Sequence, residues 1–265
     1  MTDALRPRSA GLWHVFAVQY GTRTSLRSTH FHYPDERGGE PHPTAYYVWL
    51  ALSRTDTVLI DAVIAPSTAS GMPGLEYFGS PLEIIGRLGI APGDIDLCVL
   101  THLHYDHTGV VADMPRTRYV LQRRELEYWN GPWAGRITQE QWLHSRPDID
   151  HVAASSRVDL VDGDRELLPG LSVHSVGGHT AGMQVVRLRT ARGNVVLASD
   201  ASHFYENIES DNPFAILHCL PDMFGAFDRI RELADSSDHI VPGHDPLVAK
   251  RFPAHGEHPY VVRIG

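Results

Sequence analysis

The sequence of 265 residues has the composition of a folded globular protein, with 42% hydrophobic and 21% charged residues, and is long enough to bury a sizeable core. Its 32 acidic residues exceed its 23 basic ones, which gives a formal net charge of −9, and no run of lysines or arginines is longer than two residues. This charge argues against nucleic acid as a partner, and the lack of any run of about 18 apolar residues argues against a membrane span.

We predict a single domain over residues 1–265, in which residues 1–45 form an N-terminal extension or a lid. Residues 1–15 lack the apolar stretch of a secretory signal, which predicts a cytoplasmic location. The segment 29–47 is too polar and too rich in proline for a core element. We therefore expect this segment to fold over the functional site or across a partner subunit.

The next part of the chain is predicted to alternate between strands and helices. Residues 46–52 and 57–64 have the pattern of paired strands around a short turn. Residues 81–90 have helical spacing and end at a glycine. Residues 91–100 lead into a strand of continuous apolar character, as expected for a strand that is buried on both faces.

The remaining elements follow the same scheme. We predict helices at 123–129 and 213–236, the second interrupted near Pro221, and a mixture of helix and loop between 129 and 157. The stretch DHIVPGHD at 238–245 is predicted to be a short strand that leads into a loop. Further strands are predicted at 118–122, 171–176, 183–190 and 194–200. No change in composition separates the two halves, so the strands of both should lie between helices in one domain.

The stretch THLHYDHTG at 101–109 collects three histidines and an aspartate directly after an apolar run. At an extended strand end, His102 and His104 are two residues apart and point to the same side, which suits two imidazoles that bind one ion. Asp106 and His107 follow at a turn, where they can approach a second ion. A polar turn with incidental histidines is the alternative, but this spacing favours a metal centre.

Three more candidate ligands follow predicted strands. His179 comes after the strand at 171–176 and is preceded by two glycines, which permit close approach of the backbone. Asp200 ends the strand at 194–200 and could bridge two cations. His244 comes directly after the short strand predicted near residue 240. Each residue alone also fits a surface loop, a turn or a helix cap. Their shared position at strand ends is what groups them with the histidine loop.

The motifs H-x-H-x-D-H, G-H-T-x-G, S-D and P-G-H-D resemble those of the metallo-β-lactamase superfamily, over roughly residues 46–246. The resemblance implies an α/β fold, the four-layer αβ/βα sandwich, with a dinuclear metal site along one edge. It implies that one cation is held by His102, His104 and His179, that the other is held by Asp106, His107 and His244, and that Asp200 bridges them.

Two details refine the implied metal centre. Asp61 matches an aspartate of the superfamily that orients the ligands from behind, although Ala62 and Val63 stand where Thr-Gly is usual. Zinc suits the imidazole and carboxylate set, and iron, cobalt or manganese can occupy the same ligands. The predicted cofactors are therefore two divalent cations, with Zn²⁺ preferred.

The residue types at the ligand positions argue against some functional classes of the superfamily. His107 and Asp200 stand where the commonest antibiotic-hydrolysing members carry Arg and Cys, and His104 stands where flavodiiron-type members carry Glu. The inserted domain and basic surface of the nuclease members are absent from the sequence. These differences favour hydrolysis of a small organic substrate.

The stretch SDASHFYEN at 199–207 looks like the corresponding stretch of N-acyl homoserine lactone lactonases, in which a tyrosine contacts the lactone carbonyl. Here His203 stands at that position and Tyr205 follows two residues later. The resemblance implies that a hydroxide between the two cations opens the lactone, with quorum quenching as the role. Asp106 would relay a proton to the leaving alkoxide, and His203 or Tyr205 would donate a hydrogen bond to the oxyanion.

Several points stay open at this stage. Trp129, Trp133 and Trp142 could line an apolar acyl channel or pack in the core. A thioesterase or phosphodiesterase of the same superfamily would use the same metals, and a metal-binding protein without turnover is a further alternative. The expected partner is a small lactone or ester, and the resemblance also implies a homodimer formed through the N-terminal loop.

Overall fold

The structure is a computed structural model that describes residues 5–265 and contains two β-sheets. The larger sheet has the order β13-β14-β1-β2-β3-β5-β6-β7, with β4 paired to β1, and the smaller sheet has the order β12-β11-β10-β9-β8. The larger sheet contains β1 (His14–Leu26), β2 (Pro41–Leu52), β3 (Thr57–Ile60), β4 (Glu76–Tyr77), β5 (Leu97–Val99), β6 (Arg118–Gln122), β7 (Val158–Val161), β13 (Ala254–His255) and β14 (His258–Arg263). The smaller sheet contains β8 (Arg165–Leu168), β9 (Leu171–Ser175), β10 (Gln184–Thr190), β11 (Gly193–Ser199) and β12 (Ile240–Pro242).

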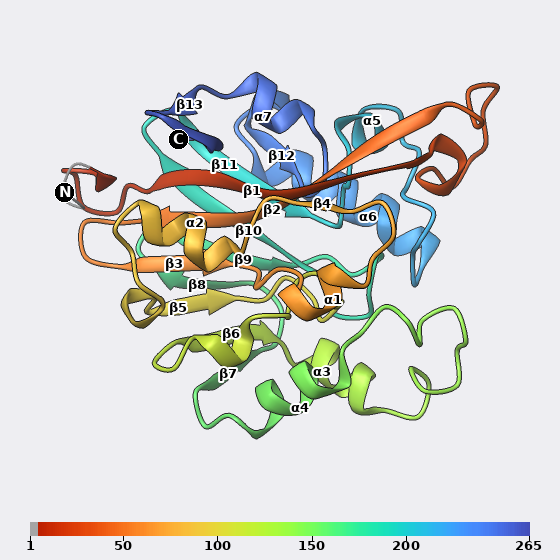
Figure 1. Ribbon diagram of the computed structural model, residues 1–265, viewed down its shortest axis with the longest axis horizontal. Coiled ribbons are helices and arrows are strands. Elements are labelled where there is room, and N and C mark those ends of the chain that lie inside the picture. The colour runs from red at the N-terminus through yellow and green to blue at the C-terminus, as the bar shows by residue number, and fades with distance from the viewer. Residues whose placement is uncertain (1–4) are drawn as a thin grey trace.

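Helices connect and cover the strands (Figure 1). The α-helices are α1 (Pro66–Ser70), α2 (Pro81–Arg87), α3 (Arg123–Asn130), α4 (Arg146–Ala154), α5 (Tyr205–Glu209), α6 (Leu220–Leu233) and α7 (Leu247–Arg251). Short 3₁₀ turns lie at Arg27–Thr29, Pro92–Asp94, Val111–Asp113 and Ser237–His239. Within residues 5–265, no helix is long and apolar enough to cross a membrane.

Three apolar clusters define the order of the layers. Successive side chains of a strand point to opposite faces, so Phe16 of β1 packs in a cluster with Ile84 of α2, whereas Val15 packs in a second cluster with Leu197 of β11. Phe227 of α6 belongs to a third cluster on the other face of the smaller sheet. The layers therefore run helices, sheet, sheet, helices, which confirms the predicted αβ/βα sandwich.

Strand direction brings distant segments to one edge of the sandwich. In the larger sheet, β3, β5 and β6 are parallel neighbours, so the loop after β5 leaves from the same edge as those after β3 and β6. In the smaller sheet, β11 is parallel to β12, and β9 runs in the same direction because both β9 and β11 are antiparallel to β10. The two edges meet where the backbone N–H of Gln184 donates to the carbonyl of Thr101 at 3.0 Å.

The N-terminal prediction needs a correction. Residues 14–26, placed within an extension or lid, form β1, which pairs with both β2 and β14 inside the larger sheet. Pro41 to Ala45, which were not predicted to be a strand, extend β2 toward the N-terminus, because they pair with the outer half of β1. Figure 1 shows β1 and β2 projecting together beyond the neighbouring strands. The connection between them, residues 27–40, is the part that remains outside the sheet.

Two element boundaries also differ from the prediction. The strand expected at 57–64 ends at Ile60, because Asp61 and Val63 have φ values of 67° and 51° and cannot continue an extended strand. The helix expected at 213–236 begins at Leu220. Pro221 lies in its first turn, where the missing N–H is not needed, so the proline starts the helix rather than interrupting it.

Candidate metal centre

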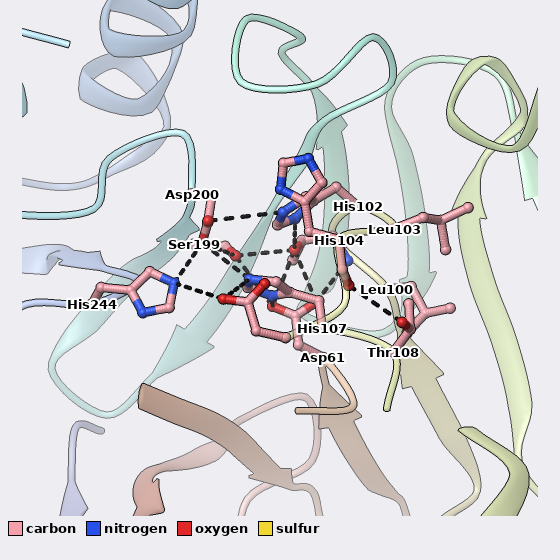
Figure 2. Close-up of polar contacts among 12 residues, drawn as sticks. Asp61, Leu100, His102, Leu103, His104, His107, Thr108, Ser199, Asp200 and His244 are labelled. Atoms are coloured by element: carbon pink, nitrogen blue, oxygen red, sulfur yellow. Dashed lines mark hydrogen bonds and ion pairs between the residues drawn. The ribbon is translucent and has the colours of Figure 1, made fainter. Parts of the chain in front are cut away.

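The seven predicted ligand side chains lie together at the edge where the two sheets meet, and Figure 2 labels His102, His104, His107, Asp200 and His244 among them. The loop after β5 brings four of them, and the loops after β9, β11 and β12 bring one each. Their nitrogen and oxygen atoms form two groups, in each of which all ligand atoms lie within 4.8 Å of one another, and a third group of the same kind joins Asp200 and His244 with His203. The first group contains His102, His104, His179 and Asp200, and the second contains Asp106, His107 and His244.

The first group has the spacing of ligands around one small cation. His179 Nε2 lies 3.0 Å from His104 Nδ1 and 3.3 Å from Asp200 Oδ2. His102 Nε2 lies 3.8 Å from the same oxygen. Zinc ligands at about 2.0–2.1 Å from the metal lie roughly 3.3 Å from one another in a tetrahedron. These side chains need only small shifts to share one ion.

The second group is assembled around the other oxygen of Asp200. His107 Nε2 lies 3.3 Å and His244 Nε2 lies 3.1 Å from Asp200 Oδ1. Asp106 Oδ2 lies 3.7 Å from His107 Nε2 and 3.8 Å from His244 Nε2. Asp200 therefore presents one carboxylate oxygen to each group, as a ligand shared by two cations would (Figure 2).

A buried nitrogen of His102 shows whether a cation would fit the first group. Nε2 of His102 is buried and has no hydrogen-bond partner among the described residues. A buried polar atom without a partner costs free energy, and an imidazole lone pair is what a divalent cation would satisfy. Since this unpartnered nitrogen faces three neighbouring ligand atoms, the residues fit a metal centre, and the donor set of imidazoles and carboxylates suits zinc.

Hydrogen bonds on the side facing away from the centre fix the orientation of two of the imidazoles. Nδ1 of His179 lies 2.9 Å from the carbonyl oxygen of Ile216, and Nδ1 of His244 lies 2.9 Å from that of Ala45. A carbonyl can only accept, so each Nδ1 carries the proton and leaves the Nε2 lone pair for the centre.

Asp61 lies behind the histidine loop and contacts both halves of the centre. Its Oδ1 accepts from the backbone N–H and the hydroxyl of Thr101, both at 2.8 Å, and its Oδ2 accepts from the Ser199 hydroxyl at 3.1 Å. The same Oδ2 lies 2.8 Å from His107 Nδ1. The left-handed backbone at Asp61, with a φ of 67°, turns the carboxylate toward these partners. This placement agrees with the role that the resemblance implied.

Burial keeps the imidazoles of the first group neutral. Burial, followed by the neighbouring imidazoles, holds the pKa of His102 and of His104 well below the usual value of 6.5. Burial is also the largest cause that lowers the pKa of His179, to about 3. A neutral imidazole has a free lone pair, so these three side chains are ready to bind a cation without first losing a proton.

The second group attracts positive charge. Burial opposes a charge on His107, but Asp200 and then the other nearby aspartates raise the pKa of His107 well above its usual value. Asp200 likewise outweighs burial at His244 and raises the pKa of that imidazole. Burial alone would raise the pKa of Asp200. Three nearby imidazoles outweigh it and hold the pKa of this carboxyl well below its usual value, namely those of His203, His244 and His107. The aspartates thus create a field that favours cations.

The structure separates the two candidates for substrate contact. His203 Nε2 lies 3.0 Å from Asp200 Oδ2, and its ring stacks on Phe214 with centroids 3.5 Å apart. Burial lowers the pKa of His203 to about 4, so its ring is neutral. Tyr205 begins α5, belongs to the cluster between the sheets and has the Arg251 guanidinium over its ring. Tyr205 therefore does not line the cavity at the metal centre.

A cavity of about 420 Å³ opens over the ligands. Residues of the N-terminal part, including His30 and Tyr46, form part of its wall. Of the three tryptophans, Trp142 lines this cavity, while Trp129 lines an adjoining cavity of about 590 Å³ that also reaches His104. Trp133 lines neither and is largely exposed.

Sequence reasoning missed several residues that shape the centre. Ser199 and Thr101 bind Asp61, and Phe214 stacks on His203. Thr101 and Ser199 each directly precede a ligand in sequence, a signal that could have identified them. Nothing in the sequence near Phe214 indicated its contact, because the segment before α6 was expected to be helical.

Close approach of the backbone at Gly109 gives a testable consequence. A Cβ at Gly109 would lie 2.1 Å from the backbone nitrogen of Ala65, on the loop that follows Asp61. Gly109→Ala is therefore expected to lower the free energy of unfolding by about 3 kcal/mol, measured by urea denaturation. Gly86→Ala is the control, because a Cβ there meets nothing within 4 Å. Equal stability of both variants would contradict the close contact.

Comparisons with known proteins agree with this geometry. The sequence model described as "Metallo-beta-lactamase superfamily" matches residues 38–261. The N-acyl homoserine lactonase AiiA of Bacillus thuringiensis subsp. kurstaki is 28% identical over 167 residues, which cover 62% of this chain and 61% of the lactonase. The matched part thus spans about three fifths of that relative's length.

Solved structures share the fold over most of the chain. A quorum-quenching N-acyl homoserine lactone lactonase superposes with a TM-score of 0.76 and 22% identity, covering 91% of this chain and 95% of that chain. AidC, described as a dizinc quorum-quenching lactonase in complex with a product, superposes with a TM-score of 0.67 and 17% identity, covering 88% of each chain. At these identities the likeness shows a common architecture.

Proposed function

The chain belongs to the metallo-beta-lactamase superfamily, and from this premise we propose that it is a metal-dependent hydrolase that opens the ring of a lactone. The observation that carries the proposal is the position of Asp200, whose two oxygens face two separate groups of ligands beneath a cavity. The lactonase relatives make N-acyl homoserine lactones the first substrates to test, with quorum quenching as the corresponding role.

We propose zinc as the metal, because the donor set suits it and AidC is described as a dizinc enzyme. When bound, two divalent cations would supply Lewis acidity toward a carbonyl and a water of lowered pKa. The first cation would be held by His102, His104 and His179, the second by Asp106, His107 and His244, with Asp200 shared.

Two side chains of this protein are placed to act on the substrate. The carboxyl of Asp106 lines the cavity and is partly exposed there, so it can hold a proton and deliver it to the leaving alkoxide. His203 also lines the cavity, and its Nε2 lies within hydrogen-bond distance of Asp200. If a cation takes that aspartate oxygen, the Nε2–H of the neutral ring is free to donate to a substrate oxygen.

The walls of the cavities favour a substrate with an apolar tail. The two cavities share His104, His179, Trp142, Leu143 and Ile216. Trp142 is largely exposed at their common boundary, where a ligand could cover its indole. An acyl or aryl tail would lie against these apolar side chains while the ester lies over the ligands.

His203→Ala tests the contact with the carbonyl oxygen. We expect the catalytic rate toward lactones to fall on the order of 10²-fold, with metal content unchanged, because one oxyanion donor is removed. Tyr205→Phe is the matched control and should keep the full rate, since Tyr205 does not line the cavity. Steady-state kinetics with parallel elemental analysis would measure both. An unchanged rate in His203→Ala would exclude this role.

A substrate panel tests the proposed function itself. The protein loaded with zinc or cobalt would be assayed by proton release against acyl homoserine lactones, simple aliphatic and aromatic lactones, thioesters and phosphodiesters. Lactones should be the fastest substrates, chelation should abolish turnover, and added metal should restore it. Faster turnover of a thioester or phosphodiester, or full activity after thorough chelation, would overturn the proposal.

A further inference from the structure

Glu125 is a buried carboxylate that takes no part in the groups described above. It lies in the first turn of α3 and has no exposed surface. Its Oε1 accepts from the backbone N–H of Leu103 at 3.0 Å and from the Trp129 indole N–H at 2.7 Å. Its Oε2 accepts from the backbone N–H of Gly182 at 2.7 Å.

The two backbone donors belong to the loops that carry the first group of ligands. Leu103 lies between His102 and His104 in the loop after β5, and Gly182 lies three residues after His179 in the loop after β9. Glu125 thus connects, through one carboxylate, the segments from two different sheets that supply all three imidazoles.

The loop of His179 is held tightly against this carboxylate. A Cβ at Gly182 would lie 2.3 Å from the backbone nitrogen of Glu125, so only glycine allows the observed approach. Burial raises the pKa of Glu125, and its three N–H donors oppose this shift because they stabilise the ionised carboxylate, which can only accept. The position in the first turn of α3 further favours a negative charge, through the helix dipole.

The second group of ligands is held by other contacts. Asp61 lies 2.8 Å from Nδ1 of His107, and the carbonyl of Ala45 lies 2.9 Å from Nδ1 of His244. None of the hydrogen bonds of Glu125 within the described structure reaches the residues of this group. Asp61 therefore contacts both halves of the centre, whereas the hydrogen bonds of Glu125 reach only the loops of the first group.

We propose that Glu125 is a positioning residue for one of the two metal positions, and that its loss leaves a centre that retains a cation only on the side of Asp106, His107 and His244. The proposal rests on the metal centre of the proposed function, but does not depend on the substrate. Partners that orient ligands typically contribute a factor of 10 to 100 in metal affinity. A selective loss of that size converts a dinuclear centre into a mononuclear one under limiting metal.

Glu125→Gln tests this proposal, because the amide keeps the size of the side chain but has only one acceptor oxygen. If that oxygen stays with Leu103 and Trp129, the NH₂ group faces the N–H of Gly182, and two donors oppose each other. The purified variant and the wild type would be titrated with zinc in competition with a chelator, and bound metal would be counted after dialysis. We expect two cations per chain in the wild type and one in the variant, with the lost cation bound at least tenfold more weakly.

Two further variants separate positioning from general damage. Thr117→Val removes another fully buried hydrogen bond, from the Thr117 hydroxyl to the Ile95 carbonyl at 2.8 Å, at the other end of β6. It should lower thermal stability and keep both cations. Glu125→Asp keeps the charge on a shorter side chain and should show an intermediate affinity, while circular dichroism verifies that each variant is folded.

Each result of the zinc titrations either supports or overturns the proposed role of Glu125. The proposal would be overturned if the folded Glu125→Gln variant bound two cations as tightly as the wild type. It would also be overturned if the variant bound both cations more weakly by the same factor. A wild type that binds no metal would overturn both this proposal and the proposed function. A wild type that binds two cations but hydrolyses no lactone would overturn only the proposed function, and the metal counts of the variants would still decide the role of Glu125.

Discussion

Replacing Asp200 with asparagine is expected to lower metal content and turnover together, and to have the largest effect of any single substitution on activity. Asparagine keeps the shape of the side chain but replaces one carboxylate oxygen with an NH₂ group that cannot bind a cation, and it removes a negative charge. Since one oxygen faces each group of ligands, at 3.3 Å from His179 Nε2 and 3.1 Å from His244 Nε2, one cation loses a ligand outright.

We expect turnover by Asp200→Asn to fall on the order of 10³-fold, which corresponds to about 4 kcal/mol of transition-state stabilisation. Elemental analysis would count the bound metal, and lactone hydrolysis would give the rate. Asp162→Asn, at an exposed ion pair with Arg123, serves as the control and should change neither quantity. An Asp200→Asn protein with full metal content and full activity would show that this carboxylate does not bridge two cations.

Asp61→Ala is expected to have the largest effect on stability. The substitution removes the only acceptor that the described residues offer the Thr101 backbone N–H, in a region closed to water. It also removes the carboxylate acceptor of the Thr101 and Ser199 hydroxyls, which keep weaker contacts with each other, with His102 and with Asp200. Each buried donor that loses its partner costs about 1–3 kcal/mol, and alanine in the left-handed conformation adds roughly 1 kcal/mol. The free energy of unfolding should therefore fall by about 4 kcal/mol in the metal-free protein, measured by urea denaturation.

Asp61→Asn provides the matched comparison. Asparagine tolerates the left-handed backbone and keeps one acceptor oxygen, so it should cost less stability than alanine. Its NH₂ group would still disturb the contact with His107 Nδ1, so metal affinity should fall in both variants. If alanine and asparagine reduced stability equally, the φ of 67° and the hydrogen bonds to Thr101 would not be the source of the effect.

The candidate metal ligands could be grouped from the sequence because their signal is local. His102 and His104 sit two residues apart after an apolar strand, and His179, Asp200 and His244 each follow another strand. Strands that run in one direction bring such residues to one edge, so position along the chain was enough to group them. That the strands lie between helices in one domain followed from the alternation of strands and helices, whereas the four-layer order came from the resemblance.

The parts that could not be predicted depend on distant partners. β1 was missed because its second half is polar, and its strand conformation is secured by pairing with β2 from Gly21 onward. His203 and Tyr205 are two residues apart in sequence, yet α5 begins at Tyr205 and turns that ring into the core between the sheets. The contacts of Glu125 join residues 22 and 57 positions away, and no short motif records them.

The meeting of two sheet edges at one cluster has a consequence for how the protein matures. The larger sheet contributes His102, His104, Asp106 and His107, and the smaller sheet contributes His179, Asp200 and His244. During synthesis the first four emerge well before the last three, so early histidines must wait for a docked second half before either cation is fully enclosed. Complete enclosure of either cation would therefore follow the docking of the two sheets.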